Sequence, residues 1–183
     1  MNYKGIIIFG AMGSGKDTLA AMLEERIFMS KIYKLGEDIR GFVDKIMDGE
    51  NNRSYYQDYG QMVRTTLIPD AWNRLCSYKI KRDIINDKLN FPIIADGRQV
   101  NEFEYWIERG FLTIGINTRQ NIRIDRLEKR DGTCEVERLT HGTELQAQYI
   151  VTQMADMEII NDLGINQLKK FADMIAAEIK EDK

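Results

Sequence analysis

The feature that most constrains this chain is a glycine-rich segment that directly follows an apolar run. The run Gly-Ile-Ile-Ile-Phe occupies positions 5–9, and Gly-Ala-Met-Gly-Ser-Gly-Lys-Asp-Thr occupies positions 10–18. A strand, a glycine-rich turn, a lysine and then a helix is the order that a phosphate-binding P-loop requires. Glycines let the backbone turn its N–H groups toward phosphate oxygens, and the positive end of the following helix adds to them. The segment therefore predicts a nucleotide-binding site, whereas a simple surface turn would explain neither the lysine nor the strand.

The residues of this loop divide into phosphate-binding and metal-binding candidates. Asp17 stands where most P-loops have Ser or Thr to ligate Mg²⁺, and the hydroxyl comes one position later, at Thr18. A carboxylate there can contact Mg²⁺ directly or through water, or it serves only as an anion in the first turn of a helix. We expect Lys16 and Asp17 to be catalytic, with Asp17 and Thr18 at the metal. The candidate nucleotide-binding set is Gly10, Met12, Gly13, Ser14, Gly15, Lys16, Asp17 and Thr18.

The rest of the chain alternates apolar strand-like runs with helical patterns. Such alternation indicates a parallel sheet with helices on both faces, whose ligands bind at the carboxyl ends of the strands. No linker or repeat divides the 183 residues, so we expect a single P-loop domain over 1–183, with a five-stranded parallel sheet. The predicted strands lie at about 4–9, 31–35, 91–95, 111–116 and 157–160.

A second polar motif, Asp96-Gly97-Arg98, follows the predicted buried strand at 91–95. A carboxylate at the end of a strand beside a P-loop commonly organises Mg²⁺ and its water shell. Arg98 can bind a phosphate through two parallel hydrogen bonds. We therefore assign Asp96 to the metal and Arg98 to catalysis and substrate binding. The alternative is a simple Asp-Gly turn with a local ion pair.

Four arginines recur at helical spacing at 119, 123, 126 and 130. Arginines delivered by a closing lid stabilise the charge that develops on a transferred phosphoryl group. We predict a lid at about 119–145, with Arg126 and Arg130 as its catalytic residues. Because acidic residues are interleaved, a solvated helix face with local ion pairs is the competing interpretation.

The segment at about 37–90 is rich in arginine, glutamine and aromatic residues and reads as helices. Aromatic faces can stack on a base, glutamine can hydrogen-bond to its edge, and arginine can hold a phosphate. We expect this segment to bind the phosphate acceptor, although aromatic residues at helical spacing also occur in cores. The candidate substrate-binding residues are Arg40, Gln57, Gln61, Arg64, Trp72 and Arg98.

Several segments together resemble the phage-type deoxynucleoside monophosphate kinases. They are Gly-Ser-Gly-Lys-Asp-Thr at 13–18, the Gln-x-x-Gly…Arg…Trp pattern at 57–72, Asp-x-Arg-x-x-Asn-Glu at 96–102, His-Gly-Thr-Glu at 141–144 and Asp-x-x-Ile-Ile-Asn at 156–161. The resemblance implies ATP and Mg²⁺ as cofactors and transfer of the γ-phosphoryl group to a nucleoside 5′-monophosphate. Gly97 and Gln61 depart from the family pattern. Positions 96–110 also resemble phosphomevalonate kinases, and positions 126–132 resemble dephospho-coenzyme A kinases, so a phosphorylated metabolite is the alternative acceptor.

Composition narrows the remaining function classes. The net charge of −3 argues against a general nucleic-acid binder, and no apolar run approaches the length of a membrane span. An Asn-Lys-x-Asp segment, typical of GTPase switches, is absent. The two cysteines, Cys76 and Cys134, have no metal-site spacing. We expect a cytoplasmic enzyme, monomeric or homodimeric, whose partners are small-molecule nucleotides and which binds neither nucleic acid stably nor membranes.

Overall fold

The computed structural model describes residues 3–47, 53–86, 88–132 and 142–181. Its centre is one parallel sheet of five strands in the order β2-β3-β1-β4-β5. The strands are β1 (Gly5–Gly10), β2 (Ser30–Tyr33), β3 (Phe91–Gly97), β4 (Phe111–Asn117) and β5 (Met157–Ile160). The five-stranded parallel sheet predicted from the sequence is confirmed, and each strand begins within one residue of its predicted start.

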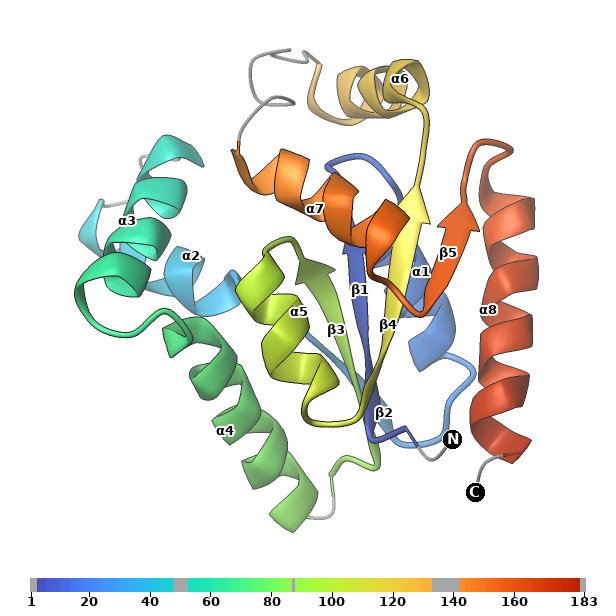
Figure 1. Cartoon of the computed structure of the whole chain (residues 1–183), viewed down its shortest axis with the longest axis horizontal. Helices are drawn as coiled ribbons and strands as arrows, with labels where there is room; N and C mark the ends of the chain where they lie inside the picture. Colours follow the sequence, from blue (N-terminus) through green and yellow to red (C-terminus); the bar gives the residue numbers. More distant parts are fainter. Residues whose placement is uncertain (1–2, 48–52, 87, 133–141, 182–183) are drawn as a thin grey trace.

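Helices cover both faces of this sheet (Figure 1). Helices α1 (Lys16–Glu24) and α8 (Ile165–Glu181) pack on one face, and α5 (Val100–Ile107) and α7 (Gly142–Gln153) cover the other. Helix α4 (Ala71–Ile85) joins the second face, with Cys76 and Ile80 in its core. Helices α2 (Glu37–Ile46) and α3 (Arg53–Thr66) lie beside the sheet, and α6 (Gln120–Asp131) lies above its carboxyl edge.

Strand β1 explains why the core has two halves. All six of its residues are buried, because helices cover the sheet on both sides. Successive side chains point to opposite faces, so Ile6 and Ile8 enter the α1/α8 core whereas Ile7 and Phe9 enter the α4/α5/α7 core. The glycine-rich loop therefore follows directly from a fully buried central strand.

The sheet register brings the two predicted motifs together. Gly10 pairs with Ile116 of β4, and Phe9 pairs with Gly97 of β3. The loop that follows β1 and the turn that follows β3 therefore leave the sheet at the same edge. This is the edge at which open α/β sheets bind their ligands.

Helices α2 and α3 form a small core of their own, which corrects one prediction. Trp72 packs there with Ile39, Val43 and Val63, and its indole N–H donates to the Gly60 carbonyl at 3.1 Å. With its ring in this core and its one donor satisfied, Trp72 holds the helices together and does not line the cavity described below. The predicted ligand contact of Trp72 is therefore wrong.

None of the helices in the described part of the chain is long and apolar enough to cross a membrane.

Candidate functional site

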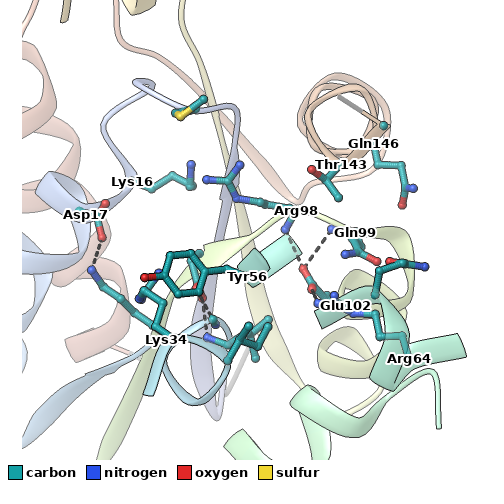
Figure 2. Close-up of a pocket in the computed structure, with 18 of the residues that line it drawn as sticks. Lys16, Asp17, Lys34, Tyr56, Arg64, Arg98, Gln99, Glu102, Thr143 and Gln146 are labelled. Carbon is teal, nitrogen blue, oxygen red and sulfur yellow. Dashed lines mark hydrogen bonds and ion pairs between the residues drawn. The ribbon is translucent and has the colours of Figure 1, made fainter. Parts of the chain in front are cut away.

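A cavity of about 720 Å³ opens at the carboxyl edge of the sheet. Its walls come from the P-loop, the β2–α2 connection, helix α3, the β3–α5 turn and the first turn of α7 (Figure 2). The size falls within the range of small-molecule sites. The lining holds six cationic side chains, Lys16, Lys34, Arg40, Arg64, Arg98 and Arg130, and four acidic ones, Asp17, Asp58, Asp96 and Glu102. The excess of positive charge suits an anionic ligand.

The loop at 10–16 has the conformation that its glycines predict. Gly13 and Gly15 have φ of 80° and 107°, in the left-handed region that favours glycine. Helix α1 begins at Lys16, so the N–H groups of its first turn have no acceptor within the helix. The Lys16 ammonium donates to the carbonyls of Gly10 at 2.6 Å and Ala11 at 3.0 Å, which leaves one of its three protons for a ligand.

The carbonyl side of the loop is held from outside the cavity. The Ser14 carbonyl accepts hydrogen bonds from Asn161 Nδ2 at 2.8 Å and Thr118 Oγ1 at 3.2 Å. Arg126 contributes too, with Nη2 at 2.9 Å from the Asn161 carbonyl and Nη1 at 3.4 Å from the Gly13 carbonyl. These contacts hold the loop through its carbonyls. Of its N–H groups, that of Met12 donates to Glu144 and that of Ser14 donates to the Ala11 carbonyl.

Arg126 does not line the cavity, in contrast to the prediction. Its guanidinium contacts the P-loop through the Gly13 carbonyl and supports the loop from the other side. Arg130, one turn further along α6, does line the cavity and is paired with its neighbour Asp131 at 2.6 Å. Positions 133–141, which complete the predicted lid, lie outside the described residues.

Burial, followed by the charge of Arg98, lowers the pKa of Lys16 to about 7, against the opposing effect of Glu144, Asp17 and Asp96. Above pH 7 the nucleotide-free protein therefore holds Lys16 mostly neutral. Bound phosphates favour the ammonium form, so binding must take up a proton.

We expect the dissociation constant for Mg-ADP to rise with pH between about 7.5 and 9, by up to about tenfold per pH unit. Isothermal titration calorimetry in buffers of different ionisation enthalpy measures both the affinity and the proton uptake. An affinity that stays constant across this range, with no proton uptake, would contradict the assignment of Lys16 to the phosphates.

Two predicted metal-binding carboxylates line this cavity. Asp96 Oδ1 accepts from the Leu35 N–H at 2.7 Å and Oδ2 from the Gly36 N–H at 3.0 Å, which fixes the carboxylate at the cavity wall. Asp17 forms an ion pair with Lys34 at 2.6 Å. Burial raises the pKa of Asp17, but the Lys34 hydrogen bond and nearby cations outweigh it and hold the pKa below its usual value.

These carboxylates fit a magnesium ion held in part by substrate phosphates. Mg²⁺ prefers oxygen ligands, keeps several waters, and is commonly held by one or two carboxylates together with phosphates. Asp17 and Asp96 supply such a pair. Thr18, the third metal candidate, is half-buried on α1 and does not line the cavity.

The three arginines predicted to bind substrate, Arg40, Arg64 and Arg98, all line the cavity. Arg64 of α3 pairs with Glu102 at 3.1 Å, and Arg98 pairs with Glu144. Arg40 forms no ion pair with any described residue, so its guanidinium remains available to an anionic ligand. Gln61 also lines the cavity, whereas the side chain of Gln57 lies outside the described part of the structure.

Three acidic or basic residues of this site were not assigned from the sequence. Lys34 lines the cavity from the β2–α2 connection. Glu102 accepts hydrogen bonds from the N–H groups of Arg98 at 2.8 Å and Gln99 at 3.0 Å, as Figure 2 shows. Glu144 accepts from the Met12 N–H at 2.6 Å. From the sequence alone, neither glutamate can be assigned a role. A carboxylate in the first turn of a helix also occurs simply because it stabilises the positive end of that helix.

Gly97, which departs from the pattern of the phage-type deoxynucleoside monophosphate kinases, is explained by steric crowding. A Cβ at this position would lie 2.7 Å from two atoms of the Phe9 ring, which fills the space beside the β3–α5 turn. Only glycine lets the backbone pass so close to the ring. The aromatic core next to the site thus dictates the residue between Asp96 and Arg98.

We expect Gly97→Val to destabilise the protein by about 1–3 kcal/mol, because the added side chain must displace the Phe9 ring. Urea unfolding measures this change. Gly41→Ala on α2 is the matched control, since its added Cβ meets nothing within 4 Å and should leave stability unchanged or slightly raised. A Gly97→Val protein as stable as the parent would refute the steric explanation.

The model of the AAA_18 family, described as an AAA domain, matches residues 6–150. The chain belongs to this family. No curated protein sequence matches the chain significantly.

Solved structures with the same fold are distant in sequence. The tunicamycin resistance protein of Deinococcus radiodurans is 19% identical, with a TM-score of 0.58 over 97% of this chain and 95% of that one. A gluconokinase from Sinorhizobium meliloti is 11% identical, with a TM-score of 0.55 over 100% and 97% of the two chains. A shikimate kinase from Acinetobacter baumannii is 13% identical, with a TM-score of 0.52 over 99% and 95%. The chain therefore belongs to the AAA_18 family and shares its fold with these three proteins.

Proposed function

We propose that the protein is an ATP-dependent phosphotransferase that moves the γ-phosphoryl group of Mg-ATP to a nucleoside or deoxynucleoside 5′-monophosphate. The observation that carries the proposal is the continuity of one cavity from Lys16 in the P-loop to Arg40 and Arg64 at the acceptor end. Two phosphate-binding groups in one cavity suit a reaction between two phosphates. The gluconokinase and shikimate kinase of the same fold support phosphoryl transfer in general.

In the proposed reaction, Lys16 and the loop N–H groups hold the β- and γ-phosphates of ATP. Mg²⁺, held by Asp17 and Asp96, would neutralise charge on those phosphates. Arg40 and Arg64 hold the acceptor phosphate, an oxygen of which attacks the γ-phosphorus. A new O–P bond forms, the bond to the bridging oxygen breaks, and ADP leaves. Phosphoryl transfer of this kind depends on positioning and charge stabilisation more than on a strong base.

The base of the acceptor has fewer candidate contacts than the phosphate. Gln61 lines the acceptor end, and Tyr56 does so with its hydroxyl 2.5 Å from Asp44. Since Trp72 is withdrawn into the α2–α3 core, one aromatic stacking surface is lost. The second candidate acceptor is a phosphorylated metabolite of the phosphomevalonate or dephospho-coenzyme A type. The loss of the Trp72 surface favours the phosphomevalonate type, which carries no base.

A panel of acceptors with Mg-ATP, scored by ADP release, tests the proposal. The panel contains the deoxynucleoside and ribonucleoside monophosphates, phosphorylated metabolites, and gluconate and shikimate as acceptors without phosphate. We expect turnover with a nucleoside monophosphate and a rise in its KM in Arg40→Ala. Turnover with a phosphorylated metabolite alone would select the second candidate. Turnover only with gluconate or shikimate, or none at all, would refute both.

A further inference from the structure

A buried carboxylate at the start of α7 joins the P-loop to the β3–α5 turn. Glu144 is 4% exposed and uses both oxygens, one for the Met12 N–H at 2.6 Å and the other for the Arg98 guanidinium. One buried carboxylate therefore contacts a loop amide and a cavity-lining cation at once. No step of the proposed reaction assigns a role to this residue.

Helix α7 gives Glu144 a rigid base. Ala147, Ile150 and Val151 of α7 are buried, and the helix packs on β1 and β4. Gly115 of β4 accommodates this packing, since a Cβ there would lie 2.9 Å from the Val151 backbone. A carboxylate on a helix so closely packed is suited to hold a partner in place, not to swing away from it.

Arg98 needs such a partner. Its side chain is 25% exposed and points toward Lys16, as Figure 2 shows. A long flexible side chain loses conformational freedom when it must hold one geometry. One nitrogen bound to Glu144 fixes the guanidinium, and the remaining N–H groups stay available to a phosphate.

We propose that Glu144 is a positioning residue, which is anchored by the Met12 amide of the P-loop and orients the Arg98 guanidinium toward the phosphates. The inference rests on the proposed phosphate-binding role of Arg98. Glu144 does not touch the substrate, so its contribution passes through Arg98 and disappears when Arg98 is absent.

The prediction is tested by a double-mutant cycle on the binding of a non-hydrolysable ATP analogue with Mg²⁺. Glutamine has one acceptor oxygen and one N–H₂ group, so it cannot accept from both Met12 and Arg98. We expect Glu144→Gln to raise the dissociation constant about tenfold in the parent protein, the range for a hydrogen bond to a charged group. In an Arg98→Ala background the same change should cost less than about twofold, because the residues act as a unit.

Two further variants separate positioning from folding. Glu144→Asp keeps the charge but is too short to span both partners, so it should reproduce the loss and its dependence on Arg98. Glu128→Gln, an exposed glutamate of α6, removes a charge with no cavity contact and should bind as the parent does. Thermal unfolding of each variant monitors the fold.

Either of two results would overturn the inference. An equal fold-loss in both backgrounds would mean that Glu144 acts without Arg98. Tighter binding by Glu144→Gln would mean that the carboxylate competes with a phosphate. Nucleotide binding needs no acceptor, so a failed acceptor panel with an intact Glu144–Arg98 coupling would refute the proposed acceptor alone.

Discussion

Lys16→Ala is expected to lower kcat/KM by about a thousandfold or more, because it removes a preorganised charge from the transferred phosphates. The structure supports a large effect, since the ammonium is held by two loop carbonyls in a buried position. Water cannot take the place of the Lys16 ammonium at this buried position without disturbing the loop. Steady-state kinetics with the preferred acceptor measure the loss.

The control for this variant is Lys81→Ala, an exposed lysine on α4 outside the cavity. It should retain the parent rate. Thermal unfolding should show Lys16→Ala folded and no less stable than the parent, because the substitution removes a buried ammonium whose pKa is depressed by burial. A folded Lys16→Ala protein with near-normal turnover would show that the P-loop assignment is wrong.

Arg98→Ala should produce the second largest effect, a loss of about a hundredfold in kcat/KM. Arg98 lines the same cavity as Lys16, Arg40 and Arg64, and it is close enough to Lys16 for its charge to lower the Lys16 pKa. Arg98→Lys should recover only part of the rate, since an ammonium cannot both bind Glu144 and form the paired hydrogen bonds of a guanidinium with a phosphate.

Arg74→Ala is the matched control, because Arg74 is exposed on α4 and does not line the cavity. It should behave as the parent protein does. If Arg98→Ala changed the rate no more than Arg74→Ala, the guanidinium would have no part in the transfer. Full recovery by Arg98→Lys would instead show that only a positive charge is needed.

Local patterns were sufficient to predict the sheet and the loop. Strand β1 is an unbroken apolar run between two glycines, and the glycines that follow it can adopt the left-handed conformations that the loop requires. The arrival of Asp96 and Arg98 beside Lys16 followed from the rule that parallel strands end at one edge of a sheet. These predictions needed no knowledge of distant contacts.

The residues that were misjudged depend on tertiary packing. Trp72 and the arginines of α6 show helical spacing whether they face a ligand, a core or a loop carbonyl, so spacing alone could not separate these cases. Helix α6 packs against the P-loop, where Leu127 contacts Met12, and this packing carries Arg126 to the loop carbonyls. Glu102 and Glu144 became site residues only when folding brought Arg64 and Arg98 to them.

In the proposed reaction, one cavity holds a nucleotide tail at the P-loop and an acceptor phosphate at Arg40 and Arg64. A crystal structure of the protein with Mg-ADP and the preferred acceptor would show both sites at once. We expect the ADP phosphates along residues 10–16 within reach of Lys16, and the acceptor phosphate within hydrogen-bond distance of Arg40 or Arg64. A nucleotide bound elsewhere, or an acceptor phosphate that contacts neither arginine, would contradict this proposal.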